Sequence, residues 1–183
     1  FIGGDTTTGP FGRSMREHIE KRLAPGHRDR LQFEAPVPRD ELRRIIRRAA
    51  VVACASLWES YSYACIEAMA LGACVVASDG GSLPELVEHD RSGLVCRADD
   101  AAALADALER ALGDPALRAR LGAAAADRAR ELSDAEAIAR GLEEIVWQHQ
   151  GNAKAAAASI ARASITPASS PTRDITVIVP FYN

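Results

Sequence analysis

Two carboxylates lie in a stretch that is otherwise uncharged, "WESYSYACIEAMALG", residues 58–72. Glu59 and Glu67 have no Lys or Arg near them in the sequence. A buried ionised carboxylate without a partner is costly, whereas one that faces a crevice can accept hydrogen bonds from hydroxyl groups of a ligand. We therefore expect Glu67 to bind ligand hydroxyl groups. The alternative is a glutamate on a narrow solvent-facing strip of a short helix.

The spacing of the two glutamates limits their joint chemistry. Glu59 lies in the loop just ahead of the helix that carries Glu67. If that helix extended back to Glu59, about two turns or ~12 Å of rise would separate the two side chains. This is too wide for the paired carboxylates with which hydrolases act on one bond. It suits the two ends of one extended ligand.

The start of the expected helix, residues 62–71, is a candidate anion site. A helix N-terminus offers unsatisfied N–H groups and a positive dipole end, which favour a diphosphate. Ser60 or Ser62 could cap this helix. The backbone amides of Tyr61, Ser62 and Tyr63 would then face the phosphates.

A second candidate segment is "SDGGSLPE", residues 78–85. Gly80 and Gly81 have no side chains, so a ligand could approach their backbone closely. A plain tight turn explains the two glycines equally well. Ser82 and Glu85 have the spacing of a capping box, so we expect Glu85 to serve its own helix.

Strand and helix patterns alternate along the chain. Apolar runs predict strands at residues 31–35, 51–56, 74–78 and 93–96, after a strand tail in "FIGG". Helices are expected at 11–23, 40–49 with Asp40 as its cap, 62–71, and then in two or three further segments, one with the stripe Leu104, Leu108 and Leu112 and the last starting at the capping-box spacing of residues 133–136.

Repeated βα units of this kind predict an α/β fold, a parallel sheet with helices on both faces. Ligands bind beyond the carboxyl ends of such strands. The loops after residues 56 and 78 should therefore be neighbours at that edge.

Composition excludes several classes of protein. The 183 residues carry a formal net charge of -3, which gives no reason to expect a nucleic-acid partner. No apolar run approaches the ~18 residues of a membrane span, so we expect a cytoplasmic location. The four cysteines lie in apolar runs without chelating spacing, the four histidines are scattered, and we predict no metal site.

The segment "ESYSYACIEAMALGACVVASDGGSLPELV", residues 59–87, resembles the signature of family 4 glycosyltransferases, retaining enzymes that use nucleotide sugars and have the GT-B fold. The E-x7-E spacing, the "EAMA" helix, the strand after it and the Gly-Gly loop occur in the same order. The likeness runs from about Phe1 to Trp147. It covers the Rossmann-like, donor-binding C-terminal half of that fold.

The resemblance implies a role for each part of the site. Glu67 would hold the nucleotide ribose, Glu59 would contact the donor sugar as the catalytic candidate, and the amides at the helix start would hold the diphosphate. The loop at Ala35, Pro36 and Val37 would lie against the base. The implied partners are a nucleotide-diphosphate sugar and a glycan or lipid-linked acceptor of a hexose, with no cofactor in residues 1–149.

This sequence departs from the family pattern at two places. Ala55-Ser56 stands where the family usually has Pro-Ser, and Ser60-Tyr61-Ser62 where it has Gly-Phe-Gly. The Arg and Lys that grip the diphosphate in the family, and its acceptor domain, would precede Phe1. We therefore expect this chain to be inactive by itself.

The chain divides into three segments by composition. By the resemblance, residues 1–149 are expected to form the donor-binding domain, and the composition of residues 150–173, rich in Ala, Ser, Pro and Thr, predicts a linker. Residues 174–183, "DITVIVPFYN", are an orphan strand that is similar to the opening of family 2 glycosyltransferases with the GT-A fold. The resemblance implies a second domain that uses a divalent cation.

Arginines gather on the helix expected at residues 40–49 and just before it: Arg39, Arg43, Arg44, Arg47 and Arg48. We expect a solvated face. The alternative is contact with anionic lipid headgroups at the inner face of a membrane.

Two other functions remain open on the sequence. One is a non-catalytic domain of the same fold that senses a nucleotide or docks a partner. The other is a different GT-B enzyme, such as a nucleotide-sugar epimerase. The intact Glu59 and Glu67 favour the transferase.

Overall fold

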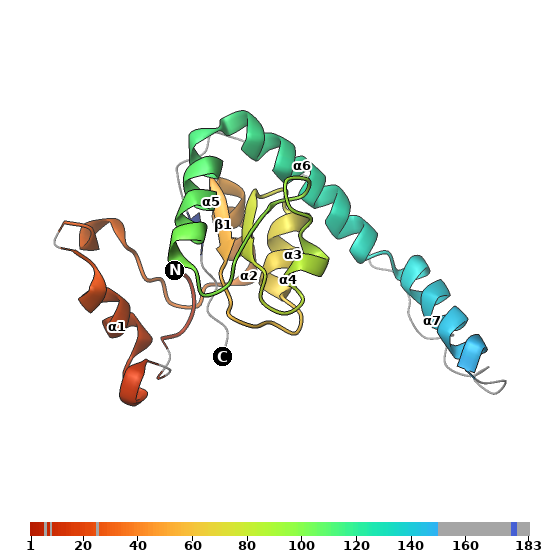
Figure 1. Ribbon diagram of the computed structural model, residues 1–183, viewed down its shortest axis with the longest axis horizontal. Coiled ribbons are helices and arrows are strands. Elements are labelled where there is room, and N and C mark those ends of the chain that lie inside the picture. The colour runs from red at the N-terminus through yellow and green to blue at the C-terminus, as the bar shows by residue number, and fades with distance from the viewer. Residues whose placement is uncertain (6, 8, 25, 150–176, 179–183) are drawn as a thin grey trace.

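The computed structural model describes residues 1–5, 7, 9–24, 26–149 and 177–178. Its described strands form one parallel sheet in the order β3-β2-β1-β4. The strands are β1 (Val51–Cys54), β2 (Val75–Ser78), β3 (Leu94–Cys96) and β4 (Val177–Ile178). The predicted α/β fold with a parallel sheet is confirmed (Figure 1).

The described helices follow the alternating order expected from the sequence. They are the 3-10 turns η1 (Pro10–Gly12) and η2 (Arg28–Arg30) and the helices α1 (Met15–Arg22), α2 (Arg39–Arg48), α3 (Tyr63–Ala70), α4 (Leu83–Leu86), α5 (Ala101–Gly113), α6 (Pro115–Leu132) and α7 (Ala135–His149). None of them combines the length and the apolarity that crossing a lipid bilayer requires.

Two apolar layers cover the two faces of the sheet. Val52 and Val75 point into one layer, with residues of α2, α3, α4 and the second half of α6. Val51 and Val76 point into the other, with α5 and the first half of α6. This period of two follows from the pleat of a strand. Every residue of β1 and β2 is buried, as expected for parallel strands covered on both faces.

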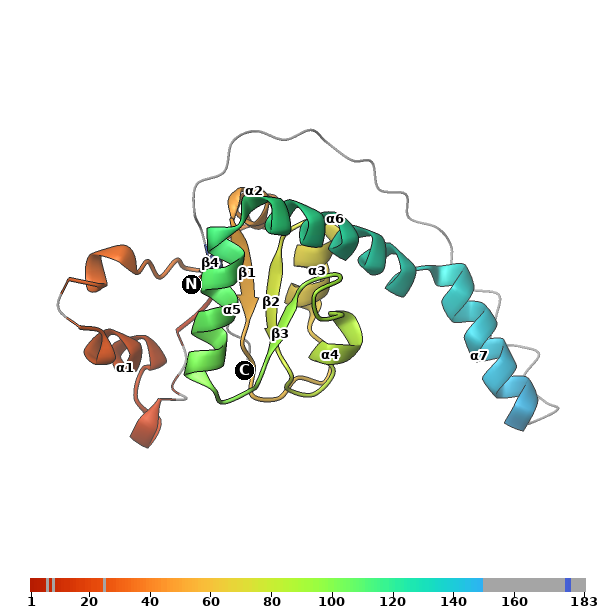
Figure 2. The same cartoon turned by 45° about the horizontal axis from the view of Figure 1, so that its top comes forward.

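Helix α6 joins the two layers. Leu121 packs in the layer under α5, whereas Ala125 and Ala129 pack in the layer under α3. Figure 2 shows α6 crossing the top of the sheet from α5 to α3, while α7 continues away from the body of the molecule. Helix α3 is thereby held between the sheet and α6.

The N-terminal segment is less regular than predicted. The helix expected from residue 11 begins at Met15, because Ser14 caps it by accepting a hydrogen bond from the Glu17 amide at 3.0 Å. Phe11 lies outside it with a positive φ of 62° and a fully exposed side chain. The strand expected at residues 31–35 is a single parallel bridge between Ile2 and Glu34.

Two predicted caps are wrong, and a third has the predicted residue without its side-chain hydrogen bond. Asp40 lies inside the first turn of α2, where it accepts a hydrogen bond from Arg43, and Pro38 occupies the cap position. Ser82 stands at the cap of α4, but its hydroxyl is buried and makes no hydrogen bond among the described residues. At α7 the side chain that accepts from the helix amides is Asp134, one residue after Ser133.

The strand at the C-terminal end is not an orphan in the described fold. Val177 and Ile178 pair in parallel with Val51 and Val52 of β1. The expected linker at 150–173 lies outside the described residues, as does most of segment 174–183. Whether that segment opens a second domain stays a prediction.

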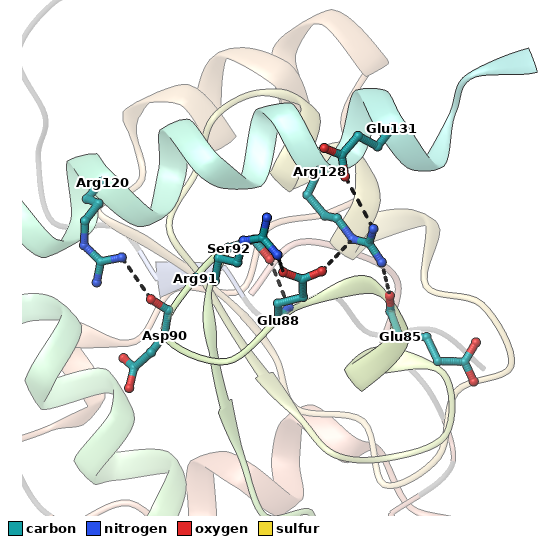
Figure 3. A network of polar contacts seen from close by, with 8 residues as sticks. All are labelled: Glu85, Glu88, Asp90, Arg91, Ser92, Arg120, Arg128 and Glu131. Atoms are coloured by element: carbon teal, nitrogen blue, oxygen red, sulfur yellow. Dashed lines mark hydrogen bonds and ion pairs between the residues drawn. The ribbon is translucent and has the colours of Figure 1, made fainter. Parts of the chain in front are cut away.

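A network of hydrogen bonds and ion pairs connects α6 to the segment between α4 and β3 (Figure 3). Arg128 of α6 donates to the Glu85 carbonyl at 3.1 Å, at the end of α4. Its guanidinium also lies 3.7 Å from Glu88 and 3.4 Å from Glu131. The network fixes the position of α4, which follows the Gly80-Gly81 loop.

Asp90 makes a second set of polar contacts between this connection and the neighbouring helices. Its backbone is in the left-handed region, with φ 61°. Arg120 donates to its carbonyl at 2.9 Å, and Arg110 pairs with its carboxylate at 2.6 Å. The hydrogen bond from Arg110 holds the pKa of Asp90 below its usual value.

Asp90→Asn should lower stability near neutral pH and leave it unchanged in strong acid. Asn tolerates a positive φ as Asp does, so the change removes mainly the charge that faces Arg110. Because the folded-state pKa of Asp90 is depressed, its contribution is present above the unfolded pKa and is lost as pH falls through the folded pKa. Urea unfolding of both proteins from pH 7 to pH 2 measures this. A stability difference that persisted at pH 2 would contradict the role of the ionised carboxylate.

Candidate functional site

The loops after β1 and β2 meet at the carboxyl edge of the sheet, as predicted. The Ser82 amide donates to the Glu59 carbonyl at 2.8 Å. The Ser78 hydroxyl donates to the Ser56 carbonyl at 2.5 Å. Both contacts join the backbone of the first loop to residues of the second, so the two loops form one structural unit.

Gly80 and Gly81 are required by this contact between loops. A Cβ on Gly80 would lie 2.6 Å from the carbonyl oxygens of Ser56 and Leu57, and one on Gly81 would lie 2.1 Å from that of Glu59. Gly81 also has a positive φ of 65°. The glycines therefore admit the neighbouring loop, a reason that the sequence did not indicate; close approach of a ligand to them stays a prediction.

Glu59 is partly buried between these loops. Its Oε2 accepts a hydrogen bond from the Ser56 hydroxyl at 3.3 Å. Its carbonyl is held by Ser82. Both the carboxylate and the carbonyl of Glu59 are thus held in the loop that precedes α3.

The start of α3 is the candidate anion site. Ser62, and not Ser60, is the cap: it is buried and accepts from the Cys65 amide at 3.4 Å. The amides of the first turn ahead of Cys65 have no carbonyl partner within the helix. Tyr61 and Tyr63 flank the cap with their rings edge to face, 5.2 Å apart, and both are exposed.

Glu67 has a partner that the sequence did not indicate. Its Oε1 lies 2.6 Å from Nη2 of Arg39, the first residue of α2, and its side chain is 34% exposed. Arg39 is distant from Glu67 in the chain, so the sequence around Glu67 did not indicate this ion pair; the Arg39 side chain is 73% exposed, as expected for a solvated face. The hydrogen bond with Glu67 raises the pKa of Arg39.

The loop at Ala35, Pro36 and Val37 leads directly into α2. Ala35 and Pro36 help to line a cavity of 240 Å³ between the N-terminal segment and α1; Val37 is not among its lining residues. Phe33 in this cavity stacks on Phe1, with the ring centroids 5.1 Å apart. Apolar and aromatic residues line most of the cavity, together with Asp5, Arg16 and Glu34.

Arg39 joins this loop to α3. It follows Pro38 in the chain and holds Glu67 from across the loop. The sequence contained no signal for this contact, because Arg39 was expected to lie just before the helix capped by Asp40, whereas in the structure it is the first residue of α2. Ser56, the partner of Glu59, was also missed, because a hydroxyl ahead of a glutamate is common in loops.

The cysteines take no part in the site. All four are buried and reduced. The hydrogen bond with Cys65 and burial together hold the pKa of Cys54 well above its usual value, so it stays a thiol. Within the described residues no group of three His, Cys, Asp or Glu side chains is arranged to hold a metal ion.

Comparisons with known proteins point to one family. The family model "Glycosyl transferases group 1" matches residues 2–128. The D-inositol 3-phosphate glycosyltransferase of Streptomyces avermitilis is 36% identical over 128 residues, 70% of this chain and 27% of that protein. The one from Nocardia farcinica is 32% identical over 165 residues, 87% of this chain and 36% of that protein.

Solved structures show the same fold. Sucrose-phosphate synthase from Thermosynechococcus elongatus matches with a TM-score of 0.66 and 31% identity over 80% of this chain and 37% of that one. HepE of Anabaena, solved in complex with UDP, matches with a TM-score of 0.61 and 24% identity over 70% of this chain and 36% of that one. This chain spans about a third of the length of these relatives.

The matched region contains both loops of the carboxyl edge, the start of α3, Glu67 and its partner Arg39. The family model covers more than half of the chain, and the region it matches forms a Rossmann-like parallel sheet. The chain therefore belongs to the glycosyl transferases of group 1.

Proposed function

We propose that this chain is the donor-binding domain of a retaining, family 4 glycosyltransferase that transfers a hexose from a nucleotide-diphosphate sugar to a glycan or lipid-linked acceptor. The observation that carries the proposal is the line that Glu59, the start of α3 and Glu67 form along the chain, from the loop at the carboxyl end of β1 into the second turn of α3. A sugar, a diphosphate and a ribose follow one another in the same way in such a donor.

Each part of the line suits one part of the donor. Glu59, fixed by Ser56, would face the sugar. The amides at the start of α3, near Ser62, would hold the diphosphate through hydrogen bonds and the helix dipole. Glu67, partly exposed, would accept hydrogen bonds from the ribose hydroxyls.

The base would lie against the loop at Ala35 to Val37. Its cavity contains the stacked rings of Phe1 and Phe33. Arg16 lies over Phe33, 5.1 Å from the ring centroid. These planar groups support the assignment, since aromatic rings and bases stack readily.

Relatives suggest which donor to test first. HepE has been solved with UDP and with UDP-glucose, so a uridine diphosphate is the natural probe. The relatives named D-inositol 3-phosphate glycosyltransferases support a small polar acceptor as one class to test. We propose a cytoplasmic location for the transfer, with α2 available for contact with anionic lipid.

Glu67→Ala should weaken binding of UDP by about 10- to 150-fold, because a hydrogen bond to a charged group contributes about 1.5–3 kcal/mol. The fold should survive, since the side chain is partly exposed. Ligand-observed NMR titration of the chain with UDP measures the affinity. Glu88→Ala is the control for folding: its side chain is also 34% exposed, and it lies on the α4–β3 connection, where it contacts Arg91 and Arg128.

Equal affinities for UDP in the unmodified chain and in Glu67→Ala would remove Glu67 from the site. If the unmodified chain bound no nucleoside diphosphate from a panel that differs in its bases, the alternative of a docking domain without catalysis would be favoured. A large loss in Glu88→Ala would show that the assay reports folding and not the site.

A further inference from the structure

The contact between Arg39 and Glu67 links two segments that lie 28 residues apart in the chain. Arg39 ends the loop that begins at Ala35 and opens α2, whereas Glu67 lies in the middle of α3. The distance from Nη2 to Oε1 is 2.6 Å, which is short for a charge-assisted hydrogen bond.

Fold stability does not explain this contact. The Arg39 side chain is 73% exposed and that of Glu67 is 34% exposed. Exposed ion pairs contribute little to stability, because water competes for both charges and two long side chains must be ordered. Most of the buried residues of α2 and α3 pack in the apolar layer, which holds the two helices without the pair.

The geometry has a use once a ligand is present. A carboxylate has two oxygens and about four acceptor directions, and Arg39 contacts one oxygen, Oε1. A guanidinium donor on Oε1 fixes the rotation of the carboxylate group, so that its remaining acceptor directions keep one orientation. Two vicinal hydroxyl groups need such a fixed pair of acceptors.

We propose that Arg39 is a positioning residue that orients Glu67 for the vicinal hydroxyls of a ribonucleotide and so makes this site selective for ribose over sugars that lack those hydroxyls. The inference rests on the proposed function, because it assigns Glu67 to the ribose. The contact between Arg39 and Glu67 also couples the loop from Ala35 to helix α3. A shift of this base-facing loop would therefore change the orientation of the ribose-binding carboxylate.

The alternative role for Arg39 is that of a countercharge for the diphosphate. A cation near the diphosphate would strengthen binding of any nucleoside diphosphate, with or without ribose hydroxyls, and would act over several ångströms. The positioning role differs, because it acts only on ligands that use Glu67. Mutating Arg39 alone therefore does not distinguish the two roles. They are distinguished by comparing a ligand that has the ribose hydroxyls with one that lacks them.

The experiment measures affinity for UDP and for 2′,3′-dideoxy-UDP by ligand-observed NMR with the whole 183-residue chain. The unmodified chain should prefer UDP by about tenfold or more, from hydrogen bonds to the charged Glu67. Arg39→Ala should weaken UDP binding about fivefold, within the range for groups coupled in one hydrogen-bond network. It should change binding of the dideoxy ligand less than about twofold, because that ligand makes no hydroxyl contact with Glu67.

Two further variants sharpen the result. Arg39→Lys keeps the charge without the planar guanidinium, so UDP binding should recover only in part. Arg43→Ala removes the same group from the same helix, where it pairs with Asp40 at 3.2 Å instead of Glu67. It should leave the preference for UDP unchanged. Thermal unfolding of each variant checks that α2 remains folded.

Each outcome decides one question. Equal weakening of both ligands in Arg39→Ala, or full recovery in Arg39→Lys, would show a countercharge and overturn the positioning role. An unchanged preference in Arg39→Ala, with the preference lost in Glu67→Ala, would overturn this inference and keep the proposed function. If the unmodified chain bound neither ligand, or if Glu67→Ala kept the preference, the proposed function would fail as well.

Discussion

Gly81→Ala is expected to destabilise the chain by about 2–5 kcal/mol. A positive φ costs a residue with a Cβ about 1–2 kcal/mol, and Gly81 has φ 65°. The new Cβ would also lie 2.1 Å from the Glu59 carbonyl oxygen, which is backbone and cannot move aside as a side chain can. Overpacking of this kind adds about 1–3 kcal/mol. Urea unfolding followed by circular dichroism measures the change.

Gly72→Ala separates the two causes. Gly72 has a similar φ of 74°, but a Cβ there would meet nothing closer than 3.8 Å. It should therefore lose only the backbone cost, about 1–2 kcal/mol. Equal losses at the two positions would mean that the loop around Glu59 gives way easily and that Gly81 is retained for its backbone conformation alone.

A variant of Gly81 that folds should still bind donor poorly. To accept the methyl group, the loop at Glu59 would have to move away from Gly81, and the hydrogen bond from the Ser82 amide to Glu59 would lengthen. Only residues 60–62 separate Glu59 from the first residue of α3. The proposed sugar and diphosphate contacts would then be displaced together.

The sequence predicted the core of the fold because local and long-range signals agree there. Apolar runs of Val, Ala and Cys gave β1 and β2 with their burial on both faces. Ser62 and Gly72 marked the two ends of α3. The N-terminal segment was predicted less well. Its expected strand at residues 31–35 has one bridge partner, and a strand is defined by its neighbour as much as by its own residues.

The sequence indicated the parts of the candidate site and the contact between its two loops, but not the side-chain contacts within it. Glu59 and Glu67 could be picked out because they are the two carboxylates in an otherwise uncharged stretch. The start of α3 could be picked out because a helix N-terminus favours an anion. The partner of Glu67 could not, because Arg39 approaches from a helix that is distant in the chain. The need for Gly81 could not either, since it arises from the backbone of another loop.

Gly122→Val in α6 should destabilise the chain by more than about 3 kcal/mol. A Cβ at this position would lie 2.3 Å from the Gly72 carbonyl oxygen. The turn at Gly72 cannot easily retreat, because the amides of Gly72 and Ala73 are bonded to Met69 and Ala68 at 2.9 and 3.1 Å. Two further methyl groups and a β-branch against this backbone add to the overpacking. Thermal and urea unfolding give the loss.

Gly122→Ala makes the argument sharper, because two effects oppose each other. Helix propensity alone predicts a gain of about 1 kcal/mol for Ala over Gly in the interior of α6. The close approach to Gly72 predicts a net loss, since the cost of overpacking exceeds that gain. Gly113→Ala near the end of α5, where a Cβ would meet nothing within 4 Å, should show the propensity effect without the contact. Stabilisation by both changes would mean that α6 does not press on the turn after α3, and the account of how α3 and its Glu67 are held in place would then be wrong.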